Sequence, residues 1–566
     1  MIVGIDLGTT NSAVAVFKDG TPQLVPNSLG DFLTPSAISI QEDGSVLVGM
    51  AARERQSTHP KVTATAFKRL IGTAKLIKLG QQHWSAEDLS SLVLKSLKAD
   101  AEAFLGEEVT GAVITVPAYF NDKQRKATRR AGELAGLKVE RLVNEPTAAA
   151  LAYGIHERDL EQPFLVFDLG GGTFDVSLVE MFDGIIEVRA SAGDNRLGGE
   201  DFNDVMVDLV REKWGNNGPQ GGDQIALTEV LRAAAERTRR ALSDNDSADF
   251  SIIWQDHSFT LSVTSEVFEE KAAPLINRLR DPVLRSLRDG NTRVESLSEI
   301  VMVGGATRMP IVRRAVTRMF GRFPNATVHP DHAVALGASI QAGLKARDAA
   351  LNEVRLTDVC PFTLGVDTGE PDGRGGYRTG IFSPIIERNT VIPASRVKSF
   401  TTLGDKQKAI ELNIFQGEAR DVSANVKLGQ ITVPVPPRRA GEIWVDCRFS
   451  YDTSGLLEID VTVPETGLVK QLVIHDQEES TASDLADRRT ALAALKFHPR
   501  EDSQNAALMA RAQRCYEGFL GDRRDYIGQL ISHFEGVLES QDPRVIESSR
   551  SDLTKQLDEM EGDRFL

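Results

Sequence analysis

Two stretches of this chain carry the same pattern: GIDLGTTNSAVAV at residues 4–16 and VFDLGGGTFDVSLVE at residues 166–180. Each has a β-branched run, an Asp, a Gly-rich turn with Thr, and a second β-branched run. Such a turn presents backbone N–H groups and hydroxyls to an anion, and glycine lets a phosphate chain come close. One copy alone is also typical of an ordinary hairpin. Two copies predict two similar lobes that face each other across a nucleotide.

The acidic residue at each turn adds a cation to this prediction. Asp6 and Asp168 would repel phosphate, so they make sense if a hydrated divalent cation lies between carboxylate and phosphate. A third turn, VGGATRMP at residues 303–310, follows a strand and starts a helix. This pattern suits a loop beneath a nucleoside, although an ordinary strand-to-helix turn has it too. The chain contains no GxxxxGK[ST] motif, so a Walker-type site is not the mechanism.

The order of patterns along the chain predicts an α/β part, then a β part, then an α part. Residues 1–350 alternate β-rich runs with helical patterns. Residues 360–476 show short strands with period-2 alternation, in which Ile410, Leu412 and Ile414 share one face. From about residue 480 apolar residues return at helical spacing. These are Ile527, Leu530, Ile531, Phe534, Val537 and Leu538.

Composition limits the class of partner. The 566 residues are 41% hydrophobic, which is enough for a large core and more than one domain. The net charge of −16 argues against nucleic acid or an anionic membrane as the main partner. Three Cys without close spacing suit a reducing compartment and offer no metal motif. With no apolar run of membrane-spanning length and no basic segment before Ile2, we expect no membrane span, no signal peptide and a cytoplasmic location.

With the three loops placed, the sequence resembles the superfamily of actin, sugar kinases and heat-shock chaperone ATPases. Further motifs narrow the resemblance to the seventy-kilodalton heat-shock chaperones, the DnaK-like family, from residue 1 to about residue 475. These motifs are VITVPAYFND (113–122), NEPTAAALAYG (144–154), LGGEDF (197–202) and LGASIQAG (336–343). The short helical end and the compact stretch after FKRLIG (67–72) look most like the HscC-type branch.

The resemblance implies a multidomain chain with four parts. These are an actin-like, two-lobed nucleotide-binding (ATPase) domain at 1–352, a linker at 353–359, a β-sandwich substrate-binding domain at 360–476 and a short helical lid at 477–566. It implies an ATP-dependent chaperone of the stress response that binds exposed apolar segments of unfolded proteins, with ATP binding and hydrolysis switching peptide affinity. An actin-like filament or scaffold ATPase and a small-molecule kinase are the alternatives. The β part and the NEPTAAALAYG stretch favour the chaperone.

Catalytic positions carry over residue by residue. Lys68 in AFKRLIG matches the lysine that reaches the γ-phosphate and the attacking water, and Glu145 in NEPTAAA matches the acid near the metal and the water. Without the resemblance, Lys68 would be interpreted as an exposed helix lysine, and Pro146 at a helix start also explains the Glu-Pro pair. The full catalytic set that the resemblance implies is Asp6, Lys68, Glu145, Asp168, Thr173 and Asp175.

The implied cofactors are ATP or ADP, Mg²⁺ and K⁺. Asp6 and Asp168 match positions that hold Mg²⁺ through water, and Asp175 matches a position beside K⁺. On periodicity alone ERTRRALS (236–243) is a charged helix face, whereas the resemblance makes it an adenosine clamp. The nucleotide-binding positions are Gly8, Thr9, Thr10, Gly171, Gly172, Thr173, Gly199, Glu200, Glu236, Arg239, Arg240, Ser243, Gly304, Gly305, Arg308 and Asp331.

The implied partners are unfolded or extended peptide segments and a J-domain co-chaperone. The segment after KRLIG is shorter than in typical bacterial members, which puts the usual nucleotide-exchange partner in doubt. Positions that relay the nucleotide state or contact the J-domain are Pro117, Arg125, Arg141, Asn144 and Asp358; an ordinary surface role is the alternative for the last three. Peptide-pocket positions are Val366, Phe400, Leu403, Ile410 and Leu412, for which plain sandwich core is the alternative.

The linker EVRLTDV, residues 353–359, is more polar than the leucine-rich linker of the family. Docking on an ATPase domain gains mainly from buried leucine side chains, roughly 1.5–3 kcal/mol for each one fully buried. Arg355 and Thr357 would resist burial, so we expect a weaker docked state and looser coupling than in a typical member.

Overall fold

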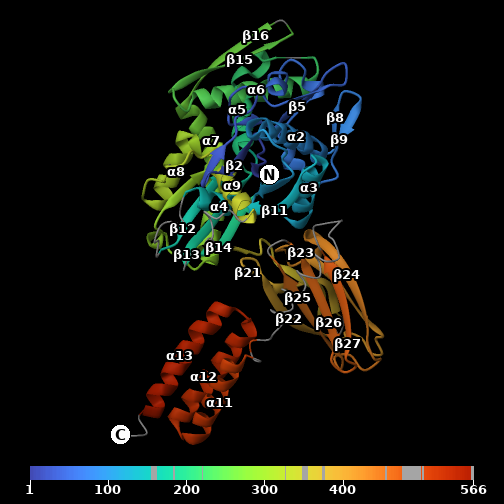
Figure 1. The fold of residues 1–566 in the computed structure, drawn as a ribbon, viewed down its shortest axis with the longest axis vertical. Helices are drawn as coiled ribbons and strands as arrows, with labels where there is room; N and C mark the ends of the chain where they lie inside the picture. The colour runs from blue at the N-terminus through green and yellow to red at the C-terminus, as the bar shows by residue number, and fades with distance from the viewer. Residues whose placement is uncertain are drawn as a thin grey trace. The chain divides into compact units, whose positions relative to one another are not determined.

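The computed structural model describes residues 1–153, 162–182, 185–219, 221–255, 257–325, 327–346, 355–371, 377–452, 455–474, 499 and 502–562. The chain divides into two compact units, Met1–Phe362 and Thr363–Leu566, which can be followed by colour in Figure 1. The start of the predicted linker, 353–354, and the first part of the predicted lid, 477–498, lie outside the described residues.

Two sheets of the first unit share a four-strand arrangement, β10-β1-β2-β3 in one and β17-β12-β13-β14 in the other, and each has a further strand at a different edge. One has the order β11-β10-β1-β2-β3, and the other has the order β17-β12-β13-β14-β18. In each sheet an antiparallel hairpin, β1–β2 or β12–β13, carries a predicted phosphate loop at its turn, and the next strand, β10 or β17, pairs in parallel. The strands are β1 (Ile2–Asp6), β2 (Asn11–Lys18), β3 (Thr21–Leu24), β10 (Gly111–Val116), β11 (Lys138–Asn144), β12 (Phe164–Leu169), β13 (Phe174–Phe182), β14 (Ile185–Asp194), β17 (Ile300–Val303) and β18 (Arg355–Val359).

The strand register repeats as well as the strand order. Asp6 lies opposite Ala13 across its hairpin, and Asp168 lies opposite Asp175 across the other. Each Asp therefore stands at the carboxyl end of the first strand of its hairpin. The sequence repeat is confirmed as a structural duplication, with one acidic residue at the same place in each copy.

A crossing of two helices joins the two lobes. Helix α9 (Ala333–Lys345) packs against β1, β2 and α4 (Glu145–Ala152), and α4 in turn contacts β12. A Cβ atom on Gly337 would lie only 1.7 Å from the carbonyl oxygen of Ala148, and a Cβ on Gly4 would lie 2.1 Å from the backbone nitrogen of Ser339. Only glycine allows backbones to approach so closely. The crossing fixes the strand that ends at Asp6 relative to the helix that begins at Glu145.

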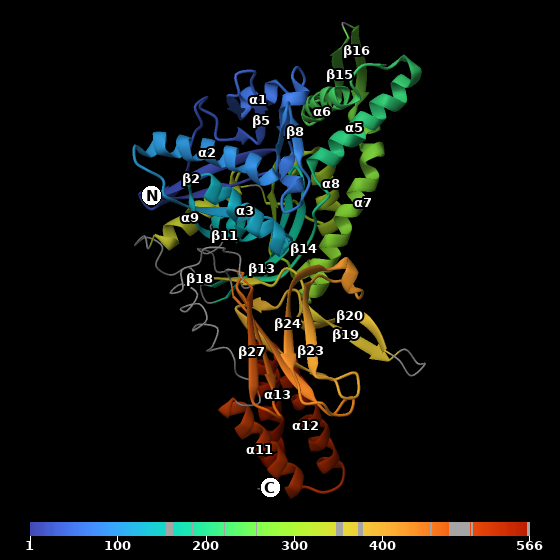
Figure 2. The same ribbon diagram turned by 90° about the vertical axis from the view of Figure 1, so that its right-hand side faces the viewer.

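Each lobe has its own apolar core, and helices cover the sheets. The first core includes side chains of α2 (Ala86–Leu105) and α3 (Asp122–Leu134). Helix α3 begins with a capping box between Asn121 and Gln124, which satisfies two backbone N–H groups. The second core includes side chains of α5 (Gly199–Trp214), α6 (Gln224–Ala241), α7 (Ser265–Asp289) and α8 (Pro310–Phe320). Figure 2 shows the hairpin β15–β16 (Ser247–Trp254, His257–Thr264) beside α6.

Part of the predicted linker is a strand of the second sheet. Residues Arg355–Val359 form β18 and run parallel to β14, with Leu356 opposite Ile186. Parallel pairing uses backbone N–H and C=O groups, so polar residue types at 355 and 357 do not prevent it. The expectation of weak docking considered side chains only and left out this backbone contribution. The strength of coupling stays a prediction.

The second unit contains two antiparallel sheets and a helical bundle. The sheet orders are β20-β19-β23-β24 and β22-β25-β26-β27. The strands are β19 (Leu364–Pro371), β20 (Tyr377–Ile386), β22 (Ala394–Thr401), β23 (Ala409–Gln416), β24 (Val426–Pro434), β25 (Trp444–Tyr451), β26 (Leu457–Val463) and β27 (Leu468–Ile474). Ile410, Leu412 and Ile414 are buried on one face of β23, as their alternation predicts.

The helical bundle consists of α11 (Ser503–Gly518), α12 (Asp522–Ser540) and α13 (Pro543–Gly562), drawn in red in Figure 1. Four of the six residues that were predicted from helical spacing lie in its apolar core, and the other two, Leu530 and Ile531, are partly buried and pack against it. The predicted α/β, β, α order is therefore confirmed. Of the helices that the structure describes, none combines the length and the apolar character needed to cross a membrane.

The helix crossing gives a first testable prediction. We expect Gly337→Ala to lower the free energy of unfolding of the first unit by at least about 2 kcal/mol, because the methyl group would meet a backbone oxygen. Urea unfolding of the full chain, followed by hydrogen exchange of the α9 amides, measures this. Gly536→Ala on α12 is the control, since nothing lies within 4 Å of its Cβ position and alanine favours a helix. Equal stability of Gly337→Ala and the unmodified chain would contradict the close crossing.

Candidate functional site

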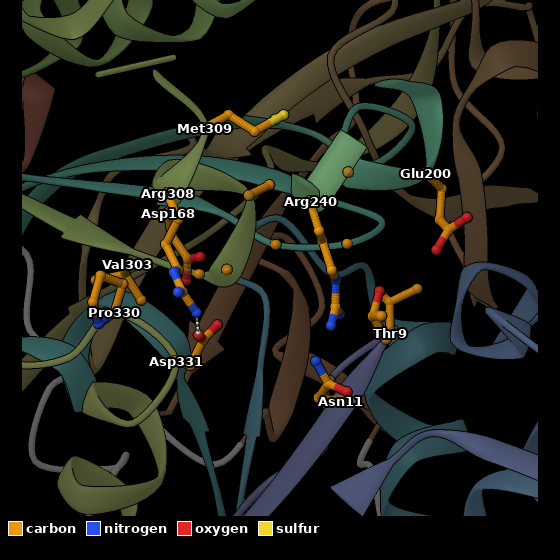
Figure 3. Close-up of a pocket in the computed structure, with 18 of the residues that line it drawn as sticks. Thr9, Asn11, Asp168, Glu200, Arg240, Val303, Arg308, Met309, Pro330 and Asp331 are labelled. Atoms are coloured by element: carbon orange, nitrogen blue, oxygen red, sulfur yellow. Dashed lines mark hydrogen bonds and ion pairs between the residues drawn. The ribbon is translucent and has the colours of Figure 1, made fainter. Parts of the chain in front are cut away.

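A pocket of about 680 Å³ lies between the two lobes of the first unit. Its walls come from the turns after β1 and β12, from α6 and from the loop after β17. Figure 3 labels Thr9 of the first turn, Asp168 at the end of β12, Arg240 of α6 and Arg308 of the loop after β17. All of the predicted catalytic and nucleotide-binding residues line the pocket except Gly172 and Asp175. Two turns that are far apart in the sequence thus meet at one cavity, as the repeat predicts.

Glycine allows the two predicted phosphate loops to approach each other. A Cβ on Gly171 would lie 1.9 Å from Thr10 Oγ1, and a Cβ on Gly172 would lie 2.8 Å from Thr9 Cγ2. Both glycines therefore face the loop of the other lobe. The backbone N–H of Glu200, in the first turn of α5, donates to the carbonyl of Gly171 at 2.8 Å. Threonine hydroxyls and a helix N-terminus at one cavity favour an anionic ligand.

Four carboxyl groups surround one ammonium group at this end of the pocket. Burial, then the charge of Glu145, raises the pKa of Asp6 to about 7 and that of Asp175 to about 8. Burial and the charges of Glu145, Asp175 and Asp6 raise the pKa of Asp168 well above its usual range, and Lys68 offsets only part of this. Desolvation and neighbouring negative charges both disfavour the ionised form of a carboxyl group. A further positive charge at this place would therefore stabilise the ionised carboxylates.

These groups fit a hydrated Mg²⁺ ion of the kind that the fold implies. Asp168 Oδ2 is buried and has no hydrogen-bond partner in the described part of the chain. In that part, no three His, Cys, Asp or Glu side chains are placed so that they could hold a metal ion directly. Mg²⁺ keeps most of its waters in such sites, so Asp6 and Asp168 would hold it through water. Asp175 lies behind this layer, where its Oδ1 accepts the backbone N–H of Tyr119 at 3.1 Å.

Lys68 is buried, which contradicts its interpretation as an exposed surface lysine. It belongs to a short 3-10 helix, Phe67–Leu70, and its side chain is only 4% exposed. Its Nζ donates to Glu145 Oε1 at 3.2 Å. Glu145 is the first residue of α4, where Pro146 suits the helix start. The two residues thus reach the pocket from different elements of the chain.

Three charged residues of ERTRRALS, namely Glu236, Arg239 and Arg240, line the pocket, whereas Arg237 is exposed. Glu236 accepts a hydrogen bond from Arg53, and its Oε1 forms an ion pair with Arg240 Nη2 at 2.7 Å. Burial alone would raise the pKa of Glu236, but these two arginines hold it below its usual value. Arg239 is half-buried, its Nε donates to Asn203 Oδ1 at 2.8 Å, and desolvation lowers its pKa. Paired charges of this kind give a polar but neutralised surface.

The loop after β17 forms the opposite wall. Gly304 has a φ of 83°, which favours glycine, and a Cβ on Gly305 would lie 2.5 Å from Asp331 Oδ1. Arg308 Nη1 lies 3.5 Å from Asp331 Oδ2, a contact drawn as a dashed line in Figure 3. The two glycines let this loop pack closely against Leu169 and Asp331.

Sequence reasoning missed the contacts that join the lobes beside the pocket. Arg53, on α1 (Met50–Glu54), reaches Glu236 of the other lobe, and its Nη1 lies 3.5 Å from Asn11 Oδ1. Three further contacts join the same two segments of the chain. They are Gln56–Glu229 at 3.0 Å, Lys61–Asp223 at 2.8 Å and Arg69–Asp201 at 2.6 Å. Their only signal in the sequence is charge complementarity between residues 53–69 and 201–236.

The predicted relay residues are partly connected. Arg125 Nη2 donates to Asn144 Oδ1 at 2.5 Å, and Asn144 Nδ2 donates to Asp358 Oδ2 at 2.5 Å. Asp358 is part of β18, and burial raises its pKa. Arg141 instead donates to Gln341 Oε1, at 3.3 Å.

Pro117 begins a turn whose next residues were not predicted as site residues. Tyr119 donates its N–H to Asp175, and its ring lies 4.4 Å, centroid to centroid, from that of Phe362. Phe120 closes the turn by donating its N–H to the carbonyl of Pro117 at 3.1 Å. The turn therefore touches Asp175, behind the pocket, on one side and the last residue of the first unit on the other.

The predicted peptide-binding residues are buried to different degrees. Val366, Ile410 and Leu412 are buried, and Val366 lies opposite Ile414 in the paired strands. Phe400 and Leu403 are half-buried. Leu403 Cδ1 would lie 2.8 Å from a Cβ on Gly369 of β19. Burial of the first three agrees with both a peptide pocket and a sandwich core, so their role stays a prediction.

Two duplicated lobes that enclose a phosphate-binding pocket define the chain's first unit as an actin-like ATPase domain, and a β-sandwich and helices follow it. The sequence matches the Hsp70 protein family over residues 2–78 and 73–564. It is 39% identical over 496 residues to the chaperone protein DnaK of Thermotoga neapolitana, which covers 86% of this chain and 82% of that protein. This chain belongs to the Hsp70 family. It is an ATP-dependent molecular chaperone and an ATP hydrolase, and the filament and kinase alternatives are not favoured.

The lobe-to-lobe contacts give a second prediction. We expect Arg53→Met to speed ADP dissociation about tenfold, because it leaves buried Glu236 without one of its two arginine partners and unties the lobes. Stopped-flow displacement of a fluorescent ADP measures the rate. The control is Lys61→Met, which removes a lobe-to-lobe contact whose lysine is 71% exposed and should change the rate by less than about twofold. Equal rates in the two variants would show that Arg53 does not hold the pocket closed.

Proposed function

We propose that the pocket binds ATP with Mg²⁺, that hydrolysis there switches the affinity of residues 360–476 for extended apolar peptides, and that β18 carries the coupling. The observation that carries the proposal is the buried cluster of four carboxyl groups and Lys68 at the meeting point of two phosphate loops. The negative charges of such a cluster outnumber its positive charge, and a cation bound together with phosphate would neutralise them.

In this mechanism a water molecule attacks the γ-phosphoryl group, and no covalent enzyme intermediate is needed. Mg²⁺, when bound, neutralises phosphate charge and orders water. Lys68 donates to a γ-phosphate oxygen, Glu145 orients the Lys68 ammonium and the attacking water, and the Thr9, Thr10 and Thr173 hydroxyls hold phosphate oxygens. Catalysis comes from positioning and charge neutralisation.

The nucleoside would lie between the two remaining walls of the pocket. Glu236, Arg239, Arg240 and Ser243 would hold the ribose and base on the α6 side. Gly304, Gly305, Arg308 and Asp331 would hold the base from the other side. A K⁺ ion beside Asp175 would balance the carboxyl group that lies behind the Mg²⁺ layer.

Peptide binding is proposed for the β part of the chain. An extended peptide needs apolar side-chain pockets at alternate positions beside main-chain hydrogen-bonding groups. Val366, Ile410 and Leu412 offer one apolar face, and Phe400 and Leu403 are its less buried companions. The helical end, 477–566, would act as a lid.

Further parts of the proposal rest on the family resemblance. A J-domain co-chaperone would contact Arg141, Asn144 and Asp358, with Pro117 and Arg125 relaying the nucleotide state. The nucleotide-exchange partner is left open. We propose that the protein is located in the cytoplasm and takes part in the stress response. Within the family it would belong to the HscC-type branch. The boundaries 1–352, 353–359, 360–476 and 477–566 belong to the same proposal.

The hydrolysis proposal is tested at Lys68. Lys68→Ala should leave ATP binding largely intact and lower the single-turnover hydrolysis rate at least ~100-fold, the effect of losing one electrostatic catalytic group. Lys78→Ala, an exposed lysine of the same lobe, is the matched control and should hydrolyse ATP normally. A normal rate in Lys68→Ala would remove the catalytic assignment.

The peptide proposal is tested at Leu412. Leu412→Asp places a carboxylate among apolar side chains, which is unfavourable without a partner. We expect peptide affinity, measured by fluorescence anisotropy of a labelled apolar peptide, to fall at least about tenfold while the basal ATPase rate and thermal stability change little. If the second unit unfolds instead, Leu412 belongs to the sandwich core and the pocket assignment is wrong.

A further inference from the structure

The ammonium group of Lys68 has a second neighbour besides Glu145. Its Nζ lies 5.5 Å from the centroid of the Phe120 ring. Both side chains are buried, with Lys68 4% and Phe120 2% exposed. A cation within about 6 Å of a ring face is attracted to it, and the attraction is larger where water is excluded.

The ring limits where the ammonium group can go. A lysine side chain has four rotatable bonds, and a single hydrogen bond to Glu145 leaves the Nζ free to turn about that contact. A second, non-hydrogen-bonding contact fixes the Nζ and uses none of its N–H donors. The remaining donors stay available for a ligand oxygen in the pocket, which Lys68 lines.

Phe120 is also connected to the predicted relay residues through its backbone. The Phe120 carbonyl accepts from Arg125 Nε at 3.2 Å, and Arg125 bonds on to Asn144. The Lys68 segment also rests on the start of α3, because a Cβ on Gly72 would lie 2.9 Å from the backbone of Gln124. A shift of residues 117–125 would therefore move the ring and the lysine together.

We infer that Phe120 is a positioning residue for ATP hydrolysis: its ring holds the Lys68 ammonium in place, and its backbone links that ammonium to Arg125. The inference rests on the proposed catalytic role of Lys68. It adds a residue that acts through Lys68 and touches no substrate itself.

Removal of the ring tests the inference. Phe120→Leu keeps an apolar side chain but loses the π face, and we expect the single-turnover hydrolysis rate to fall about tenfold with ATP affinity changed by less than about twofold. Phe120→Tyr, which keeps the ring, should restore most of the rate. Phe17→Leu is the matched control, since Phe17 is a buried ring of the same lobe, on β2, and should leave the rate unchanged. If Phe120→Leu does not fold, Phe120→Met carries the same expectation.

A double-mutant cycle separates positioning from packing. In the Lys68→Ala background, Phe120→Leu should cause no further loss of hydrolysis, because the ring has no ammonium left to hold. Additive losses, or equal rates in Phe120→Leu and Phe17→Leu, would overturn the inference. A normal rate in Lys68→Ala would instead overturn the proposed function. If Lys68→Ala hydrolyses ATP slowly and Phe120→Leu hydrolyses it at the normal rate, the proposed function stands and only the role of Phe120 is rejected.

Discussion

A surplus of buried negative charge at the ends of β1 and β12 is the constraint on which the first unit depends. Asp6, Glu145, Asp168 and Asp175 share a desolvated region with one ammonium group, and three of the four carry raised pKa values. Charges in such a place are costly unless they are paired. A cation bound with phosphate relieves that cost only when both lobes contribute, because Asp6 and Asp168 come from different lobes. The pocket therefore favours the closed arrangement most strongly when it is filled, which is the differential affinity that a ligand-driven switch requires.

The two ends of the lobe interface have different physical character. At the α4–α9 crossing, Gly337 and Gly4 bring backbones into direct contact, and no side chain can be inserted without displacing them. Beside the pocket the lobes meet through charged side chains, and Lys61 of this set is largely exposed. Exposed ion pairs contribute little to stability, whereas close-packed backbone contacts tolerate almost no change. The interface therefore tolerates little change at the crossing. Beside the pocket the exposed Lys61 pair contributes little, and the more buried Arg53–Glu236 pair contributes more.

How much the sequence could predict depended on how local each signal was. The duplicated turn, the alternation around Leu412 and the helical spacing around Phe534 are visible within a short window, and all three are borne out. The contact between Arg53 and Glu236 joins residues 183 positions apart, and no local pattern marks it. The pairing of β18 with β14 was missed for a related reason. A parallel strand pair needs no complementary side chains, so a polar linker sequence looked like a hinge. Asp175 was predicted beside K⁺ at the second phosphate loop, but its hydrogen bond to the Tyr119 N–H, which lies behind the pocket wall, could not be inferred from spacing.

The duplication is least symmetric at the position that connects the site to the rest of the chain. Opposite Asp6 stands Ala13, a small residue in an apolar cluster with Ala335 of α9. Opposite Asp168 stands Asp175, which accepts a hydrogen bond from Tyr119 of the other lobe. One copy therefore uses this position for packing, and the other uses it for a polar link between lobes. Two identical copies would bind a phosphate chain equally well, but neither would sense the other lobe through this position. Because the ring of Tyr119 contacts Phe362, where the first unit ends, the polar copy gives a change at the carboxyl cluster a direct route towards β18.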